Sequence, residues 1–277
     1  MGKLVGSFAA VHGPLMVRNW DAADAGARDQ VGRAFAELGA RIRAVAPDVL
    51  VVASPDHWVN FFIDNYPSVC IGVGATHQGP PEPWMGAFPF KEMAGHAPFA
   101  MHLAQTALDT GFEPSLSHRL ALDHGFCIPI WKTGLTSLPA LVPVVLNTIE
   151  PPMPSFARCY EWGGLIARAV ASYPDDLRVA VLGTGGLSHS IGEPTMGRID
   201  EQFDRTCLDH LASGNVTGLL RHLDGSAAKA GNGAAEMRDW LVAHGAAGGH
   251  GFELIHYQAI PQWYIGAGIA AWRVNTN

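Results

Sequence analysis

Histidine is the residue type whose placement most suggests chemistry in this chain, which has thirteen histidines among 277 residues. Three of them follow short apolar segments typical of buried strands: His12 after the first segment, His57 after the second, and His189 after a later one. Ligands of open α/β sheets gather at the carboxyl ends of strands, so these imidazoles are expected to converge on one crevice. Any one of them alone is more often a hydrogen-bonded structural histidine. The joint pattern favours proton transfer or metal binding.

A single carboxylate stands out beside these histidines. Glu236 lies in the segment Gly231-Asn-Gly-Ala-Ala-Glu-Met-Arg-Asp-Trp240, in the first turn of a predicted helix. The helix dipole there favours the ionised form that binds a metal. Two imidazoles and one carboxylate on one face of Fe(II) leave three positions for a substrate and dioxygen. The alternative is an ordinary first-turn glutamate on a solvated face.

A further histidine lies in the triplet Asp123-His124-Gly125. His124 is a candidate second functional imidazole with Asp123 as its orienting partner, although Asp-His-Gly is also a common turn. Asp56 and Asn60 flank His57 and are expected either to support it or to cap the next helix. Most of the other histidines are assigned to surface or packing roles: His77, His96, His102, His118, His210, His222, His244, His250 and His256.

Familiar nucleotide and hydrolase motifs are absent. There is no HExxH, no zinc-finger spacing and no GxxxxGK[ST]. The segment Gly183-Thr-Gly-Gly-Leu-Ser-His189 fails GxGxxG at Ser188 and fails GxSxG at Ser190. Its glycines predict a tight turn after a strand, with His189 presented at the tip.

The elements that must position these residues alternate between short apolar runs and longer amphipathic ones. This pattern predicts an α/β fold with a mainly parallel sheet and helices on both faces. Strands are expected at 3–11, 48–54, 68–73, 141–146 and 178–183, and helices at 27–45, 97–110, 156–172, 200–212 and 234–244. The Pro- and Gly-rich stretch 74–98 is expected to be a long ordered loop, and 254–272 to be buried core near a pocket.

Composition narrows the class of partner. Acidic residues outnumber basic ones 25 to 18, giving a net charge of −7, so no basic stripe for nucleic acid is expected. The four cysteines form no CxxC pair, which fits a reducing cytoplasm. No export peptide is expected, and polar residues interrupt 254–272, which argues against a membrane span. A small molecule or another subunit is the expected partner.

Seven motifs in order along the chain together resemble a known family. They are His12, Ser54-Pro-Asp-His57, DNYPSVCIGVGAT (64–76), Leu122-Asp-His-Gly125, Gly183 to His189, Gly233 to Trp240, and Ile260-Pro-Gln-Trp263. The chain resembles the LigB-type class III extradiol ring-cleavage dioxygenases, which include the catalytic β subunit of protocatechuate 4,5-dioxygenase and 2'-aminobiphenyl-2,3-diol 1,2-dioxygenase. The resemblance implies a three-layer α/β fold with a mixed sheet and one catalytic domain over 1–277.

The resemblance also implies a set of roles. His12, His57 and Glu236 would bind Fe(II), His189 would be the acid/base, and His124 would donate a hydrogen bond near dioxygen. Contacts with the substrate are expected from Asp56, Asn60, Ser190 and Trp263, although many members have Gln where this chain has Ser190.

The implied reaction opens the ring of a catechol, an aminophenol or a dihydroxypyridine with O2 in aromatic-compound catabolism. The chain is expected to act as a homo-oligomer or with a small α subunit. Two other functions stay open at this point: a zinc-dependent hydrolase using the same ligands, and a non-catalytic binding protein of the same fold.

Overall fold

A mixed eight-stranded sheet forms the centre of the computed structural model, which describes residues 1–274. The strands are β1 (Lys3–Ala10), β2 (Val49–Ser54), β3 (Val69–Gly72), β6 (Ser115–Ser117), β7 (Ala140–Leu146), β8 (Arg178–Thr184), β9 (Phe252–Ile260) and β10 (Ile265–Trp272). Their order is β6-β3-β7-β2-β8-β1-β10-β9. The four central strands β7, β2, β8 and β1 are parallel, whereas β3 pairs antiparallel with β7 and β10 with β1.

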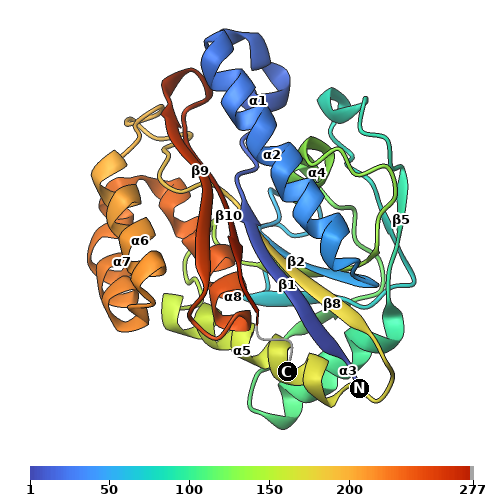
Figure 1. Cartoon of the computed structure of the whole chain (residues 1–277). Coiled ribbons are helices and arrows are strands. Elements are labelled where there is room, and N and C mark those ends of the chain that lie inside the picture. The colour runs from blue at the N-terminus through green and yellow to red at the C-terminus, as the bar shows by residue number, and fades with distance from the viewer. Residues whose placement is uncertain (275–277) are drawn as a thin grey trace.

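Helices cover both faces of this sheet (Figure 1). They are α1 (Leu15–Arg18), α2 (Ala25–Val45), α3 (Ala97–Asp109), α4 (His124–Lys132), α5 (Phe156–Ser172), α6 (Glu201–Ser213), α7 (Val216–Ala230) and α8 (Met237–Ala246). Helices α2 and α4 pack on one face, while α5 and α8 pack on the other. The expected three-layer α/β architecture is confirmed.

The central strands are apolar because both of their faces are covered. All six residues of β2 are buried, in the sequence Val-Leu-Val-Val-Ala-Ser. Helix α2 shows the matching pattern for a helix, since Val31, Phe35, Leu38 and Ile42 are buried on one stripe and face β1, β9 and β10. Burial of each such side chain contributes about 1.5–3 kcal/mol to the free energy of folding. This packing holds α2 and the strands in fixed positions, and with them the residues that follow the strand ends.

Helix α2 begins at a clear signal in the sequence. The side chain of Asp24 accepts a hydrogen bond from the Ala27 amide, which satisfies one of the free N–H groups of the first turn. The helix ends where Ala46 adopts a left-handed conformation, with φ 40°. β2 begins at Val49, only a few residues after the end of α2, so the helix leads directly into a central strand of the sheet.

The five expected strands and five expected helices are present, with boundaries that differ by a few residues. Helix α7 was not predicted, because Gly218 and Gly225 interrupt its apolar pattern. The stretch 254–272, expected to be buried core near a pocket, forms most of the β9–β10 hairpin. β10 is buried throughout, as expected, whereas β9 is mostly half-buried because it is the edge strand of the sheet. The loop 74–98 contains a small hairpin of β4 (Thr76–Gln78) and β5 (Glu92–Ala94), with the 3-10 helix η2 (Pro83–Met85) between them.

Three other short 3-10 helices occur in the described part of the chain: η1 (Trp20–Ala22), η3 (Asn232–Glu236) and η4 (Pro261–Trp263). Within residues 1–274, no helix has both the length and the apolar character needed to cross a bilayer.

Candidate metal and catalytic site

Three neighbouring parallel strands, β2, β8 and β1, end at the same edge of the sheet. His12 lies two residues beyond β1, His57 three beyond β2, and His189 five beyond β8. The structure brings these imidazoles together, as their positions after parallel strands predicted. The ring centroids of His12 and His57 are 5.0 Å apart.

Glu236 supplies a buried negative charge at this edge. One carboxylate oxygen, Oε1, lies 3.5 Å from Nε2 of His12 and 3.5 Å from Nε2 of His189. The other oxygen accepts a hydrogen bond of 2.8 Å from the Gly186 amide. Glu236 was expected in the first turn of a helix. It is the last residue of η3 and lies directly before the first residue of α8.

Burial and charge act in opposite directions on the pKa values of this group of residues. Burial raises the pKa of Glu236, but the imidazoles of His12 and His189 outweigh it and hold that pKa well below its usual range. Burial also lowers the pKa of His189, but the Glu236 carboxylate outweighs it and the net shift is upward. At His12 burial prevails and the pKa is lowered, so this imidazole is neutral at pH 7 and available as a ligand.

Each metal-ligand candidate among the histidines is oriented through its Nδ1 atom. Nδ1 of His12 is 3.1 Å from the Thr184 hydroxyl, and Nδ1 of His57 is 2.9 Å from a carboxylate oxygen of Asp123. These contacts leave Nε2 as the nitrogen of each ring that can bind a metal, which is the usual arrangement of a metal-binding imidazole, and Nε2 of His12 lies beside the Glu236 carboxylate. Burial lowers the pKa of His57, but Asp123 outweighs it and raises that pKa to about 8.

The role expected for Asp123 needs a correction. Asp123 was predicted to orient His124, its neighbour in the sequence. It is instead the N-cap of α4: one oxygen accepts from the Gly125 amide, and the other accepts from the backbone amide and the ring of His57. Both oxygens of Asp123 are thus engaged by Gly125 and His57, although one of them still lies within 4.8 Å of a ring nitrogen of His124.

The partner of His124 is Glu82, a residue that the sequence analysis missed. Its Oε1 lies 2.6 Å from Nδ1 of His124 and 3.2 Å from the His124 amide nitrogen. Glu82 lies in the loop 74–98, just before η2. The only signal in the sequence is an acidic residue within an otherwise apolar, Pro-rich segment.

His189 is presented by a firmly held turn. The Ser188 amide and hydroxyl both donate to the buried carboxylate of Asp204, at 2.7 and 2.9 Å, and the Tyr257 hydroxyl donates to the same group at 2.7 Å. Burial raises the pKa of Asp204 to about 6. Gly233 packs so closely that a Cβ atom there would lie 2.2 Å from the imidazole of His189. These contacts fix the ring against η3.

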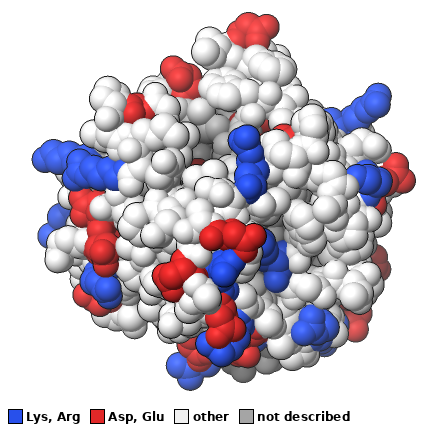
Figure 2. All heavy atoms as spheres, turned by 90° about the horizontal axis from the view of Figure 1, so that it is seen from above, with Lys and Arg blue, Asp and Glu red and all other residues white. Residues whose placement is uncertain are grey.

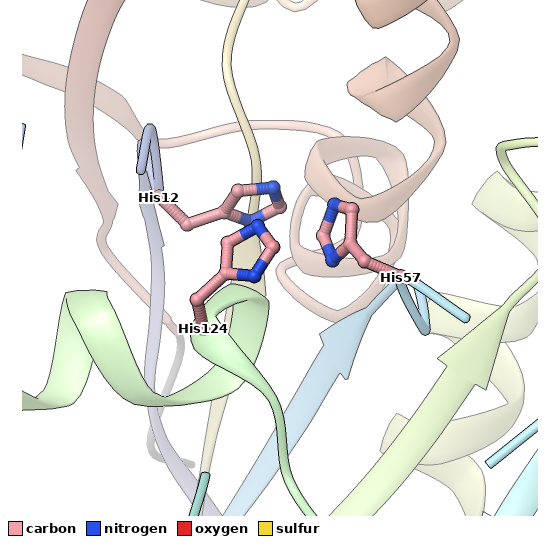
Figure 3. Close-up of side chains that lie close together, drawn as sticks. All are labelled: His12, His57 and His124. Carbon is pink, nitrogen blue, oxygen red and sulfur yellow. The ribbon is translucent and has the colours of Figure 1, made fainter. Parts of the chain in front are cut away.

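The resulting cluster has the donors that a metal ion requires. His12, His57 and His124 point toward one another (Figure 3), and one nitrogen from each lies within 4.8 Å of those of the other two. Glu82, Asp123 and His124 form a second compact set. Glu236 lies against His12 at 3.5 Å and is not a member of either compact set. Two histidines and one carboxylate are the donor types that suit non-haem iron, and His12, His57 and Glu236 offer them on the wall of one cavity.

A cavity of about 490 Å³ opens beside the cluster. Its wall includes the imidazoles of His12, His57, His124 and His189 together with Glu236, and Arg18 is the one Lys or Arg side chain on it. Trp263 lines the cavity, as expected, and its ring is stacked on Trp20 with centroids 4.8 Å apart. The rest of the wall is mostly apolar and includes Pro14, Leu15, Ile149, Ile191, Met196, Tyr264 and Ile265.

Three other residues expected to contact the substrate lie outside the set that lines this cavity. Asp56 is fully buried and accepts hydrogen bonds from the backbone amides of residues 59–61. Asn60 bonds to Asp56 and to the backbone of Ala121, so the pair organises the turn after His57. Ser190 is buried, and its hydroxyl bonds to the side chains of Glu193 and Thr195.

Comparison with known proteins identifies the family of this chain. Residues 6–268 match the family described as the catalytic LigB subunit of aromatic ring-opening dioxygenase. The chain is similar to proteins named 2,3-dihydroxyphenylpropionate/2,3-dihydroxicinnamic acid 1,2-dioxygenase. The Cupriavidus necator protein is 28% identical, covering 86% of this chain and 88% of that protein. The Rhodococcus protein is 28% identical, covering 94% of this chain and 96% of that protein.

The fold is also similar to a crystal structure of the uncharacterized protein JW3007 from Escherichia coli K12. That structure has a TM-score of 0.60 and 13% sequence identity, and the match covers 87% of this chain and 92% of the other. This likeness concerns the fold alone. The family match extends over nearly the whole chain and includes every site residue described above, so the chain belongs to the LigB family of catalytic subunits of aromatic ring-opening dioxygenases, which are oxidoreductases.

Proposed function

We propose that this protein is a non-haem Fe(II)-dependent extradiol dioxygenase that opens the ring of a catechol-type or aminophenol substrate with O2. The observation that carries the proposal is the position of His12, which lies beside both His57 and Glu236 on the wall of a largely apolar cavity. These three residues would hold the iron. When bound, Fe(II) supplies a centre that holds the aromatic substrate and dioxygen together and passes electrons between them.

The residues of the chain then have separable tasks. Glu236 is ionised and buried, so it balances the positive charge at the site without taking up a proton. His189 takes a proton from a substrate hydroxyl at Nε2, the nitrogen that faces the Glu236 carboxylate, and later returns it. A raised pKa suits His189 to this exchange near neutral pH.

His124 has a different task in this proposal. Its Nδ1 is tied to Glu82, which leaves Nε2 to donate a hydrogen bond into the cavity. Such a fixed donor stabilises negative charge that develops on oxygen during the reaction. The apolar wall, including Trp263 and Ile265, excludes water and packs on the face of an aromatic ring.

We also propose a cellular setting and an assembly. All four cysteines are buried and free, which supports a reducing compartment such as the cytoplasm. Phe62 and Ile63 are 53% and 77% exposed, which supports association with further copies of the chain or with a small α subunit. Light scattering of the purified chain tests the first of these two assemblies.

The test of the function is an anaerobic preparation loaded with Fe(II) and supplied with catechols and aminophenols. We expect stoichiometric iron, oxygen consumption and a coloured ring-opened product. Zinc in place of iron, together with hydrolysis of esters or amides, would refute the proposal and favour a zinc hydrolase on the same ligands.

Two variants test the assignment of roles. Glu236→Ala removes the carboxylate and is expected to lose iron, because two imidazoles alone bind it weakly. His189→Gln is expected to keep iron and to lose most of its turnover, because a glutamine side chain exchanges no proton near neutral pH. Equal iron content and equal activity in the two variants would contradict these roles. His102→Gln, at a histidine that bonds to Ala169 and Ser172 on α5, is the matched control.

A further inference from the structure

The ring of His189 makes only long polar contacts of its own. Its Nδ1 lies 3.4 Å from the carbonyl oxygen of Leu187, and its Nε2 lies 3.5 Å from a carboxylate oxygen of Glu236. Both distances exceed the range of about 2.7–3.2 Å that is usual for a hydrogen bond between nitrogen and oxygen. The position of the ring therefore depends on the backbone that carries it, together with the close packing of Gly233.

The backbone just before His189 is held at every polar group of Ser188. The Ser188 amide donates to Oδ1 of Asp204 at 2.7 Å, and the hydroxyl donates to Oδ2 of the same carboxylate at 2.9 Å. The hydroxyl also accepts from the Asp200 amide at 2.7 Å, and the carbonyl accepts from the Gly266 amide at 3.1 Å. Two of these four contacts end on one carboxylate, so Asp204 is the main support of this turn.

Asp204 carries a buried charge that no cation neutralises. Charged side chains of both signs lie interspersed on the surface seen from above (Figure 2), whereas Asp204 is fully buried. In the described part of the chain it forms no ion pair. Burial raises its pKa to about 6, which leaves it largely ionised at pH 7. Hydrogen-bond donors alone balance this charge, and bonds to an ionised acceptor are roughly twice as strong as neutral ones.

The structure of α6 does not account for this carboxylate. The N-cap of α6 is Asp200, whose side chain accepts from the Phe203 amide. Asp204 lies in the first turn and accepts instead from Ser188 and from the hydroxyl of Tyr257, at 2.7 Å. Tyr257 lies on the edge strand β9. Burial and the Asp204 carboxylate both raise the pKa of Tyr257 well above its usual value, so its hydroxyl remains a donor.

The carboxylate also has little room to move. A Cβ atom on Gly266 would lie 2.3 Å from Oδ2 of Asp204, so the backbone of β10 packs directly against this oxygen. Both oxygens of Asp204 accept hydrogen bonds, and Oδ2 accepts two of them. An asparagine has nearly the same shape, but its NH2 group would face a donor at either position. Asp204→Asn therefore breaks at least one contact without opening a cavity.

We propose that Asp204 is a positioning residue for His189, acting through Ser188, and that Tyr257 in turn holds Asp204. This inference deepens the proposed function and rests on it, because it concerns the proton transfer assigned to His189. It makes that transfer depend on α6 and β9, two elements that carry none of the metal-ligand candidates. Proton transfer needs a close and fixed geometry, and a misplacement of about 1 Å can cost about 100-fold in rate.

Steady-state kinetics of the iron-loaded protein test the proposal, with the diol that the wild type turns over fastest. We expect Asp204→Asn to lower kcat by about 10- to 100-fold, and Tyr257→Phe by about three- to tenfold, because it removes one of the three donors. The KM for the diol and the iron content should stay within about twofold of the wild type. The matched control is Asp209→Asn at an exposed residue of the same helix, and it should behave as the wild type. Loss of iron in parallel with kcat would overturn the proposal.

A double-mutant cycle separates positioning from general damage to the fold. If Asp204 acts through His189, Asp204→Asn should lower the residual kcat of His189→Gln by less than about twofold, because no proton transfer is left to misplace. Effects of the two substitutions that multiply would overturn the proposal. So would a wild-type kcat in Asp204→Asn alone.

Hydrogen exchange followed by mass spectrometry gives a readout that needs no turnover. The peptide that contains Ser188 should exchange at least about tenfold faster in Asp204→Asn, because the amide that donates to the carboxylate is released, and at the wild-type rate in Asp209→Asn. Unchanged exchange in Asp204→Asn overturns the positioning role even if the wild type opens aromatic rings. A wild type that turns over no diol refutes the proposed function instead, and faster exchange would then still show that Asp204 holds the turn before His189.

Discussion

The contact between Glu82 and His124 yields the sharpest prediction for the proposed mechanism. Both side chains are nearly buried, with 16% and 9% of their surfaces exposed, and their 2.6 Å contact joins a carboxylate to an imidazole. The same carboxylate oxygen accepts a hydrogen bond from the His124 backbone amide. Glu82 therefore positions both the imidazole ring and the first residue of α4. If His124 stabilises charge on oxygen through Nε2, removing Glu82 must weaken catalysis without removing the metal ligands.

The size of the effect follows from the kind of contact that is lost. A hydrogen bond to a charged group contributes about 1.5–3 kcal/mol, and one between neutral groups about 0.5–1.5 kcal/mol. Glu82→Gln exchanges the first kind for the second and should cost about 1 kcal/mol, or about fivefold in rate. Glu82→Ala loses both contacts and should cost about 2–3 kcal/mol, or roughly 30- to 150-fold.

The assay is steady-state oxygen consumption at varied O2 with saturating diol, together with the iron content of each preparation. We expect kcat/KM for O2 to fall in the order wild type, Gln, Ala, while iron content stays constant. Glu92→Gln is the matched control: this exposed carboxylate lies in the same loop and bonds only to the Gln78 side chain among the described residues.

Two results would refute the reasoning. Full kcat/KM for O2 in Glu82→Ala would show that the orientation of His124 does not matter to the reaction. Loss of iron in proportion to activity would show that Glu82 or His124 belongs to the metal site itself, as the compact set of Glu82, Asp123 and His124 permits.

Three further predictions follow from other contacts. Iron affinity of the metal-free protein should fall about tenfold per pH unit below pH 8, because His57 has a pKa of about 8 and must lose its proton to bind; a flat calorimetric profile would contradict this. Gly233→Ala should keep iron and lose at least about tenfold in turnover, because its Cβ would displace the ring of His189, and unchanged turnover would count against that packing. Asp239 is fully buried and its carboxylate has no hydrogen-bond partner within residues 1–274, so burial raises its pKa well above the usual value. Because the pKa of Asp239 is higher in the folded than in the unfolded protein, the folded state loses stability as the pH rises through the folded pKa. Asp239→Asn removes this loss and should raise the melting temperature more at pH 8 than at pH 4. An equal shift at the two pH values would refute this.

The parts of the site that the sequence predicted are those set by the sheet. His12, His57 and His189 follow parallel strands, and the register of β2, β8 and β1 leaves no other edge for them to occupy. Strand identity was readable because these segments are short, apolar and bounded by turn residues. The hairpin of β9 and β10 was less readable, since both strands and their turn form one stretch without charged residues between 254 and 272.

The parts that the sequence did not predict depend on contacts between distant segments. Glu82 precedes His124 by 42 residues and reaches it only because the loop 74–98 folds back through the β4–β5 hairpin. Adjacency favoured Asp123 as the partner of His124, but capping geometry decides which way an N-cap carboxylate points. Spacing along the chain therefore located the imidazoles and failed to assign the carboxylates that orient them.

The loop 74–98 contacts both His124 and Arg18. Glu82 fixes His124, and Trp84, two residues later, lies between His124 and the guanidinium of Arg18. A change that shifts η2 must therefore alter both the proposed hydrogen-bond donor near oxygen and the place of Arg18 on the cavity wall. Binding of the aromatic substrate and the use of O2 are then expected to change together when the loop changes.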